Sequence, residues 1–590
     1  MKYILGINLP LKSKCHESGV ALIDLDGNIL FAANEERFSR NKLDGDFPER
    51  SIKKMFEYTG IAKEDIIYVA VPTLSRARKA LRFAEFIFRE RLSHLFRLKT
   101  YAVLSKILIR EKSDKPYSDE SGGFKIRYFW KDFIKTNFPN AQIKYVEHHV
   151  AHAAGAYFCS PWERALFATS DGAGNILTSL VGLAENGRLK AVAKTFLPHS
   201  MGSFWGSITK VCGFKSGTRH GGKVTGLAAS GNPAKLIDKM RQAVWAEGLK
   251  IKTVPELFFD NSKLLPNWDS YEPERIKKLI GEATREDVAA AAQQRLEEVV
   301  VEIVKNLRKK IDCDKIVLAG GVFANVLLNQ KILALDGISD IFVFPAMSDG
   351  GIALGSAFLT LSKMKERAGS RLLPKRIANV YLGPHYTNQE IETALEKQGL
   401  KYSKMETPAK TVAGLVHGNK VVALYQGRME YGPRALGNRS IIYAPIDPTV
   451  NDWLNKKLNR SEFMPFAPVT MIEHVKNCYL GIAADPVAAR FMTVTYHCTE
   501  AMKTKAPACV HLDGTARPQV IDRATNPYYY DIINEYYKLS GIPTLINTSF
   551  NMHEEPIVAS PEDAIRAFLD SGIDYLVLEN YLCGFAENQK

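Results

Sequence analysis

The stretch ALFATSDGAGNILTSLVGLAENGRLKAVAKTF (165–196) decides how this sequence folds. Its first six residues predict a strand, the small polar turn DGAGN follows, and the remainder predicts a hairpin that turns at Asn186-Gly187. The same order stands at the start of the chain, where YILGIN (3–8) precedes GVALIDLDGNILFAAN (19–34), a hairpin that turns at Asp26-Gly27. A pattern that occurs twice in this way predicts a duplicated α/β domain whose halves face each other across a cleft.

Two later strand-to-helix junctions carry paired glycines, after a helix-rich stretch at about 272–312. They are KIVLAGGVFANVLLNQKI (315–332) and DIFVFPAMSDGGIALGSAFLTL (340–361). Glycine lets backbone N–H groups approach a phosphate at the N-terminus of a helix, although such turns are often only tight connections. The nucleotide contacts predicted for this part of the chain are Gly172, Gly320, Gly321, Asn325 and Gly350.

The segment EHHVAHAAGAY (147–157) contains the strongest metal-binding pattern in the chain. His148 and His152 lie four residues apart in an alanine-rich segment, so a helix would project both imidazoles from one face. Asp171 and Asp349 each end an apolar strand beside glycine and complete the predicted ligand set. Two histidines with carboxylates suit a divalent transition metal that keeps positions open for substrate oxygens. A structural pair of histidines is the alternative, and the neighbouring His149 is expected to point elsewhere.

A charged turn follows the first predicted hairpin. The segment EERFSRNKLDGDFP (35–48) brings Arg37, Arg40 and Lys42 together, downstream of the HESG turn at 16–19. Cations beside a phosphate-binding turn can neutralise a developing negative charge. A solvated charged turn explains the same residues, and the pattern alone leaves both interpretations open.

The last third of the chain has a different pattern, and we predict a second domain at 385–590 behind a linker at 365–384 and a first domain at 1–364. Its motif QGRMEYGPRALGNRS (426–440) combines arginines with glycines, and planar guanidinium groups suit bidentate binding of phosphates. Together, its polar residues predict a pocket for a polyanion such as Mg–ATP. The predicted contacts are Arg428, Arg434, Arg439, Lys457, Arg460, Arg517, Asn547 and Ser549.

Composition excludes several classes of protein. The 590 residues are 46% hydrophobic and 24% charged, as in soluble globular proteins, and no apolar run is long enough for a transmembrane helix. The eight cysteines are scattered, which argues against a disulfide framework and fits the cytoplasm. Much of the net charge of +14 comes from the segment 76–112, with eleven Lys/Arg against three Glu. This segment could contact a membrane, RNA or an anionic substrate, but a solvated helical insertion is the simpler interpretation.

At these motifs the sequence resembles the O-carbamoyltransferases of the nodulation and antibiotic-tailoring family, over almost the whole chain. The motifs are HHVAH, SDGAGN, GGVFAN and SDGG in the first domain, and GRMEYGPRALGNRS, FMPFAP, DGTARPQ and NTSFN in the second. The resemblance implies a duplicated actin-like (ribonuclease-H-like) first domain, similar to the tRNA-threonylcarbamoyl transferase fold. It implies an α+β second domain, similar to the enzyme that makes the carbamoyl-adenylate.

The resemblance also implies a reaction. The second domain would use carbamoyl phosphate and Mg–ATP to make carbamoyl-AMP, and the first would transfer the carbamoyl group to a hydroxyl of a small acceptor, such as a natural product or sugar. The metal in His148, His152, Asp171 and Asp349 would be Fe²⁺, with Zn or Mn as alternatives. His16 matches the histidine of the family's first loop, as a base or an adenylate contact, and Lys42 matches the lysine after EERF.

The sequence departs from the family pattern at several places. The lead-in to His16 is longer than usual, GLAASG (226–231) replaces GLAPYG, and Met464 replaces a second arginine, so that Lys457 or Arg460 must carry more of the phosphate contact. Two other functions remain open: a fused tRNA-threonylcarbamoylating enzyme and a non-catalytic actin-like binding protein. Unless the first of these holds, nucleic acid is not expected as a partner. The acceptor and the oligomeric state cannot be read from the sequence.

Overall fold

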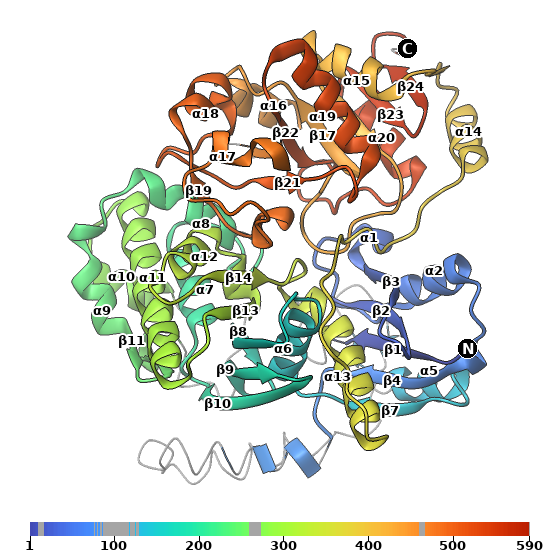
Figure 1. Cartoon of the computed structure of the whole chain (residues 1–590). Coiled ribbons are helices and arrows are strands. Elements are labelled where there is room, and N and C mark those ends of the chain that lie inside the picture. The colour runs from blue at the N-terminus through green and yellow to red at the C-terminus, as the bar shows by residue number, and fades with distance from the viewer. Residues whose placement is uncertain are drawn as a thin grey trace.

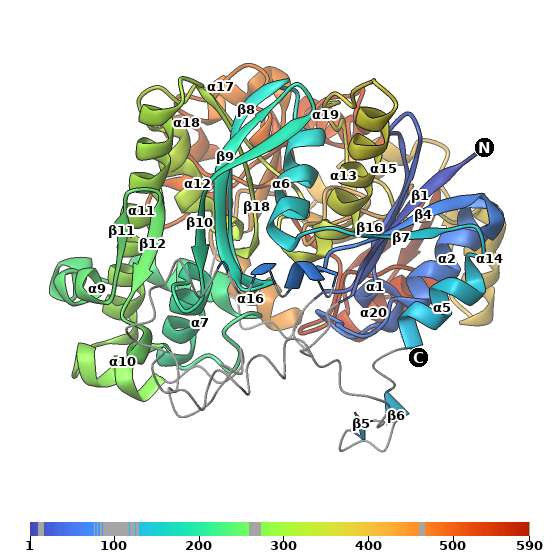
Figure 2. The same ribbon diagram turned by 90° about the horizontal axis from the view of Figure 1, so that it is seen from below.

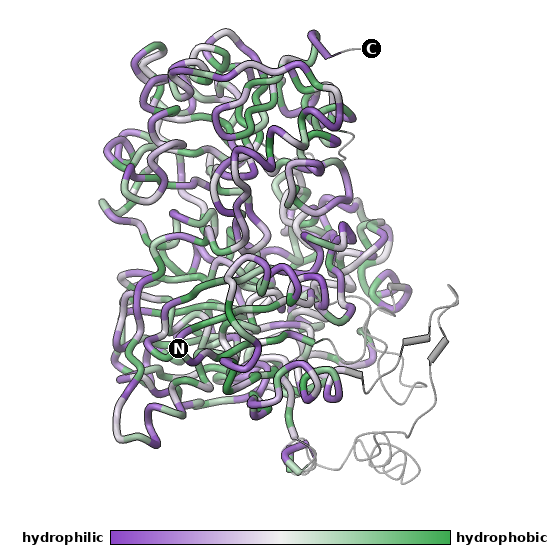
Figure 3. The backbone as a smooth tube through the Cα atoms, turned by 90° about the vertical axis from the view of Figure 1, so that its right-hand side faces the viewer, coloured by the Kyte–Doolittle hydropathy of each residue, from purple (hydrophilic) through white to green (hydrophobic). Residues whose placement is uncertain are grey.

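A computed structural model describes most of the chain. The described residues are 1–9, 17–75, 77–79, 81–82, 85, 117–118, 124–125, 129–258, 273–458 and 466–588. The predictions for His16 and Arg460 lie outside them, as does most of the prediction for the basic segment 76–112. Hydrophobic residues lie mainly in the interior of the molecule, and hydrophilic residues lie toward its periphery (Figure 3).

The front part of the chain contains two sheets built on one plan. The first has the order β3-β2-β1-β4-β7 and the second the order β10-β9-β8-β13-β14. In each sheet, the strand that comes first along the chain (β1 or β8) pairs antiparallel with the first strand of the hairpin that follows it. The same strand pairs parallel with a later strand, β4 or β13. The bounds are β1 Tyr3–Asn8, β2 Gly19–Asp24, β3 Ile29–Asn34, β4 Ile66–Val71, β7 Gln142–Tyr145, β8 Arg164–Gly174, β9 Leu177–Glu185, β10 Arg188–Phe196, β13 Lys315–Ala319 and β14 Asp340–Val343. This is the predicted duplicated actin-like (ribonuclease-H-like) architecture.

Two helices stand between these sheets (Figures 1 and 2). Helix α6 (His148–Phe158) packs on β8 and β13 of the second sheet, and α13 (Ile352–Arg367) packs on β1, β2 and β4 of the first. The two helices contact each other through small residues, because a Cβ on Gly355 would lie 1.9 Å from the carbonyl oxygen of Ala151. This close approach brings the N-terminal end of α6 toward the turn that starts α13.

The remaining elements of the front part surround this centre. The first half adds α1 (Glu36–Ser39), α2 (Glu49–Thr59), β5 (Tyr117–Ser118), β6 (Phe124–Lys125) and α5 (Phe129–Asn137). The second half adds α7 (Met201–Val211), α8 (Gly221–Leu227), α9 (Ile237–Ala243), β11 (Val244–Glu247), β12 (Lys250–Thr253), α10 (Pro273–Ile280), α11 (Arg285–Lys310) and α12 (Val326–Leu333). Helices α10 and α11 correspond to the helix-rich stretch that the sequence predicts.

The last third of the chain folds around a separate mixed sheet, with the order β15-β24-β23-β16-β17-β22-β18-β21. These strands are β15 Ser403–Lys404, β16 Val422–Tyr425, β17 Arg439–Tyr443, β18 Ala467–Met471, β21 Gln519–Ile521, β22 Thr544–Ser549, β23 Tyr575–Leu578 and β24 Tyr581–Gly584, and a short pair joins β19 (Tyr496–His497) to β20 (Thr515–Ala516). The helices are α14 Asn388–Lys397, α15 Pro408–His417, α16 Val450–Lys457, α17 Val475–Cys478, α18 Glu500–Lys505, α19 Pro527–Ser540 and α20 Pro561–Ser571.

The faces of this sheet follow from the alternation of side chains along β16. Val422 and Leu424 pack with residues of α15 and α19, whereas Ala423 and Tyr425 pack in another core with residues of α14 and α20. Successive side chains of a strand point to opposite faces, so the two helix pairs cover opposite sides of the sheet. The segment between α13 and α14 contains no further helix within the described residues and connects the two parts.

The two parts contact each other directly, with the C-terminal part lying across both halves of the front part (Figure 1). The Arg40 guanidinium donates to the carbonyl oxygens of Pro556 and Ile557, both at 2.8 Å. In the second half, Asn329 Nδ2 donates to the carbonyl oxygen of Thr493 at 2.7 Å. None of the helices in the described ranges is long and apolar enough to cross a membrane.

Candidate functional site

Helix α6 positions the two predicted histidine ligands. Its first turn is capped by Glu147, whose carboxylate accepts the Val150 N–H at 2.9 Å. His148 and His152 follow on one face of the helix, because residues four apart lie nearly one above the other. Both are buried, with exposed fractions of 7% and 2%, so these imidazoles face the interior.

Asp171 reaches the histidines from an irregular part of β8. The sequence predicts a turn after Ser170, but β8 continues to Gly174, and its register with β9 is interrupted between these two residues. Such a bulge changes the direction in which side chains project from a strand. The Asp171 carboxylate accepts the N–H groups of Gly172 at 2.7 Å and Gly321 at 3.3 Å, which fixes its orientation.

Asp349 lies in the turn that starts α13, and the first half of the domain holds this turn. Asn8 Nδ2, at the end of β1, donates to the Asp349 carbonyl oxygen at 2.8 Å. The Glu17 carboxylate accepts the Gly350 N–H at 2.8 Å and the Ser348 hydroxyl. Burial, together with the neighbouring Glu36 charge, raises the pKa of Glu17 to about 7. The turn of the second half that carries Asp349 is therefore fixed by residues of the first.

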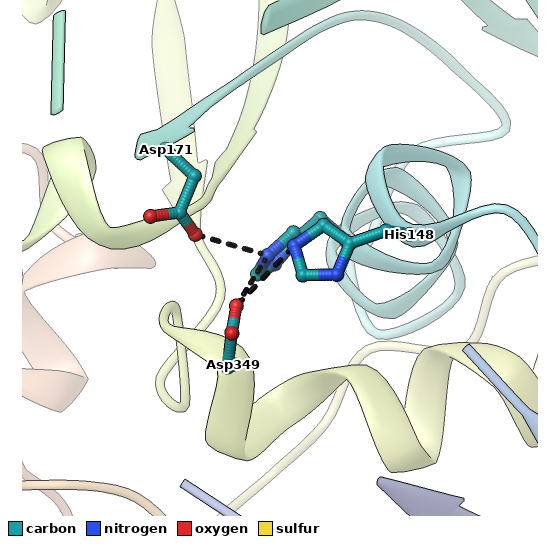
Figure 4. A group of neighbouring side chains, drawn as sticks. His148, Asp171 and Asp349 are labelled. Carbon is teal, nitrogen blue, oxygen red and sulfur yellow. Dashed lines mark ion pairs between the residues drawn. The ribbon is translucent and has the colours of Figure 1, made fainter. Parts of the chain in front are cut away.

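These elements bring His148, His152, Asp171 and Asp349 together, with one ligand atom of each within 4.8 Å of the others (Figure 4). Asp349 Oδ1 lies 3.3 Å from Nε2 of both histidines, and His152 Nε2 lies 3.3 Å from Asp171 Oδ2. Burial alone disfavours the imidazolium, but contacts with both carboxylates raise the pKa of His152 to about 9.

The group fits a divalent cation. Two imidazoles and two carboxylates supply the nitrogen and oxygen donors that transition metals bind. His148 Nε2 and His152 Nε2, the ring nitrogens that face the carboxylates, are buried and have no hydrogen-bond partner among the described residues. By contrast, His149 contacts Thr169 Oγ1 at 2.9 Å and the Leu177 carbonyl oxygen at 3.1 Å, so it points away from the group as predicted.

Gly174→Ala is expected to abolish metal binding, because a Cβ there would lie 2.1 Å from the Cγ and Cδ2 atoms of His148. Gly172→Ala is the matched control, since a Cβ on Gly172 meets no atom within 4 Å. Isothermal titration of each variant with Mn²⁺ measures the effect. Equal Mn²⁺ affinity in the two variants would contradict the proposed part of His148 in the site.

The glycine junctions have different environments from one another. Gly320, at a φ of 101°, lies so close to β8 that a Cβ would stand 2.3 Å from the Ser170 carbonyl oxygen. Its neighbour Gly321, like Gly172, donates to Asp171. The Gly350 N–H, which the sequence assigns to a nucleotide, is bound by Glu17 instead.

Asn325 also has a different environment from the one predicted. Its side chain exchanges hydrogen bonds with Gln293 at 2.7 and 3.1 Å, and it caps α12 by accepting the Leu328 N–H at 3.1 Å. These bonds, with one to Thr225 at 3.3 Å, occupy the amide group. Asn325 is therefore a buried residue that links α11 to the start of α12.

In the C-terminal part, Arg434 and Arg517 come together. Burial lowers the pKa of Arg517 well below its usual range, and the nearby charge of Arg434 lowers it further. No hydrogen bond or ion pair of Arg517 is found in the described ranges. Asn547 lies beside them, since its Nδ2 donates to the Ala435 carbonyl oxygen at 3.2 Å. Two partly buried cations that repel each other form a site suited to an anion.

Arg428 and Arg439, which the sequence predicts as phosphate contacts, bind main-chain carbonyl oxygens instead. Arg428 donates to Leu30, Leu382 and Gly383 at 2.6–2.9 Å. Arg439 is fully buried, donates to Gln426, Gly427 and Asn438 at 2.6–3.2 Å, and lies 3.6 Å from the ring centroid of Tyr425. The donors that make these bonds are used within the fold, because a buried guanidinium needs several acceptors.

The loop that carries Arg434 is organised by a buried carboxylate. Glu430 is fully buried, and its Oε1 accepts the N–H groups of Leu436, Asn438 and Arg439 at 2.8–3.1 Å. The Glu430 side chain thus accepts the backbone N–H groups that carbonyl oxygens would accept in a helix or strand.

Glu430→Ala is expected to lower the free energy of unfolding by about 3 kcal/mol, because it leaves several buried N–H groups without an acceptor. Glu500→Ala, at a side chain that is 87% exposed, is the control and should change it by less than about 0.5 kcal/mol. Urea denaturation followed by tryptophan fluorescence measures both changes. Similar values for the two variants would show that Glu430 does not organise the loop.

The charged turn at 35–48 joins the two parts of the chain. Arg37 donates to the Gly432 carbonyl oxygen at 2.5 Å, and Arg40 binds main-chain oxygens of the C-terminal part as described above. These two arginines therefore do not form the solvated cationic turn that the sequence leaves open. Lys42 lies near Glu554. Burial acts to raise the pKa of the Glu554 carboxyl, but a hydrogen bond from His220 and the charge of Lys42 lower it overall.

Two further predicted contacts lie elsewhere in the C-terminal part. Lys457 Nζ stands 3.9 Å from Asp574 Oδ1, at the end of β16 opposite to the Arg434 loop. Ser549 lies two residues after Asn547 on β22 and donates to Asn551 Oδ1 at 2.6 Å. Sequence reasoning did not select Asn8, Glu17 or Glu430. Of these, Glu17 and Glu430 had a local signal, their places in the HESG and QGRMEYGPRALGNRS motifs.

Comparison with known proteins assigns the chain to a family. The model of the carbamoyltransferase N-terminus matches residues 4–358, and that of the carbamoyltransferase C-terminus matches residues 413–584. An uncharacterized protein of Synechocystis is 30% identical, over 99% of this chain and 96% of its own length. Nodulation protein NolNO of Sinorhizobium fredii is 30% identical, over 98% of this chain and 80% of its own length.

Among solved structures, component A of the (R)-2-hydroxyglutaryl-CoA dehydratase of Acidaminococcus fermentans matches 62% of this chain and 99% of its own, with 15% identity and a TM-score of 0.34. The family models cover most of the chain and contain both the His/Asp group and the arginine pair. The chain therefore belongs to the carbamoyltransferase family and is an enzyme that transfers a carbamoyl group.

Proposed function

We propose that this enzyme is an ATP-dependent O-carbamoyltransferase with two sites, one for activation and one for transfer. The observation that carries the proposal is the convergence of His148, His152, Asp171 and Asp349 in the front domain of a carbamoyltransferase. The separate arginine pair in the C-terminal domain supports a second, anion-binding site.

The C-terminal site would perform the activation. Carbamoyl phosphate reacts with water to give carbamate and inorganic phosphate, a carbamate oxygen attacks the α-phosphorus of Mg–ATP, and pyrophosphate leaves, so that carbamoyl-AMP remains. Arg434 and Arg517 would bind the phosphate groups and stabilise their charge, because a guanidinium matches phosphate oxygens in a site that excludes water. Asn547 Oδ1 is buried without a hydrogen-bond partner among the described residues and would accept the carbamoyl N–H₂ group.

The front site would perform the transfer. The acceptor hydroxyl oxygen attacks the carbamoyl carbon, the bond to AMP breaks, and AMP leaves with the bonding electrons. A divalent ion held by His148, His152, Asp171 and Asp349 would polarise the carbamoyl oxygen as a Lewis acid. His16 is proposed to take the hydroxyl proton, and Lys42 to contact the adenylate phosphate. An adenylate also offers remote binding energy that can orient the reacting carbon.

The test is to supply the protein with ATP, Mg²⁺ and carbamoyl phosphate and to measure pyrophosphate. We expect release that depends on carbamoyl phosphate, and we expect AMP to form only when an acceptor is added. Mass spectrometry of a small-molecule extract incubated with the mixture then identifies the carbamoylated product. Pyrophosphate release that is equal with and without carbamoyl phosphate would rule out the proposed donor.

A further inference from the structure

The turn that carries Asp349 is bonded to the C-terminal domain as well as to the first half. The Tyr431 hydroxyl donates to the Gly350 carbonyl oxygen at 2.5 Å, one residue after the proposed metal ligand. Tyr431 is only 2% exposed. Burial raises the pKa of its hydroxyl, with a smaller effect of the Glu17 charge, so the hydroxyl remains a hydrogen-bond donor. A single side chain thus joins the C-terminal domain to the metal-ligand turn.

The same loop contacts the front domain at a second point. Gly432, the next residue, accepts the Arg37 hydrogen bond, and a Cβ on it would lie 3.1 Å from the Pro345 carbonyl oxygen. Pro345 belongs to the connection from β14 to α13, which also contains Asp349. Two adjacent residues of the loop therefore touch both ends of the segment that leads to the proposed ligand.

Arg434 belongs to this loop, two residues after Gly432. Glu430 binds N–H groups on the far side of Arg434, at Leu436 and Asn438, which makes the intervening residues one hydrogen-bonded unit. An anion that binds Arg434 would fix this unit in one arrangement. In the structure, the loop that carries Arg434 is in the arrangement in which Tyr431 reaches Gly350.

We infer that Tyr431 is a positioning residue that couples the two sites, so that an anion bound at Arg434 and a metal bound at Asp349 strengthen each other's binding. The inference rests on the proposed function, because it takes the two sites as given. If both ligands favour the arrangement with the Tyr431–Gly350 bond formed, linkage requires the same factor of enhancement in each direction. Typical couplings of this kind correspond to about 5-fold to 150-fold in affinity.

The experiment titrates carbamoyl phosphate calorimetrically into the full chain, once without metal and once after loading with Mn²⁺ and dialysis of the excess. We expect binding that is at least about fivefold tighter in the loaded protein. Tyr431→Phe removes one hydroxyl and should reduce this ratio to about one. Tyr425→Phe is the matched control, because its buried hydroxyl donates to the Ala559 carbonyl oxygen at 2.9 Å within the C-terminal domain, and it should keep the wild-type ratio.

The outcomes separate the inference from the proposed function. If wild-type protein binds both ligands but its affinity for carbamoyl phosphate is the same with and without Mn²⁺, the coupling is overturned and the two-site function stays intact. A Tyr431→Phe variant that keeps the wild-type ratio of these affinities has the same consequence. A wild-type protein that binds neither ligand overturns both. Hydrogen exchange in wild type needs no variant: added carbamoyl phosphate should slow exchange at the amides of 346–352, and unchanged rates there count against the inference.

Discussion

His152→Ala is expected to abolish carbamoyl transfer to the acceptor while carbamoyl phosphate-dependent pyrophosphate release continues. His152 is the ligand that faces both carboxylates, at 3.3 Å from Asp171 and from Asp349, so its removal opens the centre of the group. A Lewis acid supplies several kcal/mol to such a reaction, and about 4 kcal/mol corresponds to about a thousandfold in rate. Release should remain within about twofold, because among the described residues no contact of His152 is with the arginine pair.

The two rates are measured on one sample, pyrophosphate by an enzyme-coupled assay and carbamoylated product by mass spectrometry. Mn²⁺ titration checks that the metal is lost. Val150→Ala is the control on the same helix, since residue 150 lies on the opposite face from the ligands. If His152→Ala stopped both steps equally, the separation into two sites would be wrong.

Arg517→Ala is expected to have the opposite pattern, with pyrophosphate release slowed about a hundredfold or more. Removing a donor aimed at developing charge in a water-excluded site typically costs this much. Transfer should be unaffected when chemically prepared carbamoyl-AMP is supplied to the front site. Arg434→Ala should behave in the same way, because Arg434 is close enough for its charge to lower the pKa of Arg517.

A stability measurement strengthens this test. Burial and the charge of Arg434 lower the pKa of Arg517, so the charged form of this side chain is less favourable in the folded protein than in the unfolded chain. Arg517→Ala should therefore leave the melting temperature unchanged or raise it while activity is lost, as occurs where function requires an unfavourable arrangement. Arg523→Ala, at an exposed arginine paired with Asp531, is the control and should leave both properties unchanged. A large loss of stability in Arg517→Ala would identify Arg517 as a structural residue.

Much of the fold could be predicted because its determinants are local. The apolar runs at 3–8 and 165–170 form strands, and the turns at Asp26-Gly27 and Asn186-Gly187 close the predicted hairpins. Strand pattern and turn residues depend on neighbours a few positions away, which sequence shows directly. The helix that presents His148 and His152 was predictable for the same reason.

The roles of the arginines could not be predicted in this way. Arg428, Arg434 and Arg439 stand in one motif with similar neighbours, yet two of them bind carbonyl oxygens and only Arg434 meets Arg517. Which acceptors surround a guanidinium depends on strands and loops that are distant in the sequence. The surroundings of Asn325 could not be predicted for the same reason, since its partner Gln293 lies on another helix.

The sequence by itself predicted the duplicated sheets, a separate C-terminal domain and the residues of the His/Asp group. These predictions follow from periodicity and from residue types with few chemical uses, whereas the α+β character of the C-terminal domain was implied by the resemblance to the O-carbamoyltransferases. Only the tertiary structure decided that β8 bulges to aim Asp171, that Asn8 and Glu17 hold the Asp349 turn, and that Tyr431 reaches the same turn from the C-terminal domain. These contacts join residues from different halves or different domains, and the energy of such a contact exists only once the chain has brought both partners together.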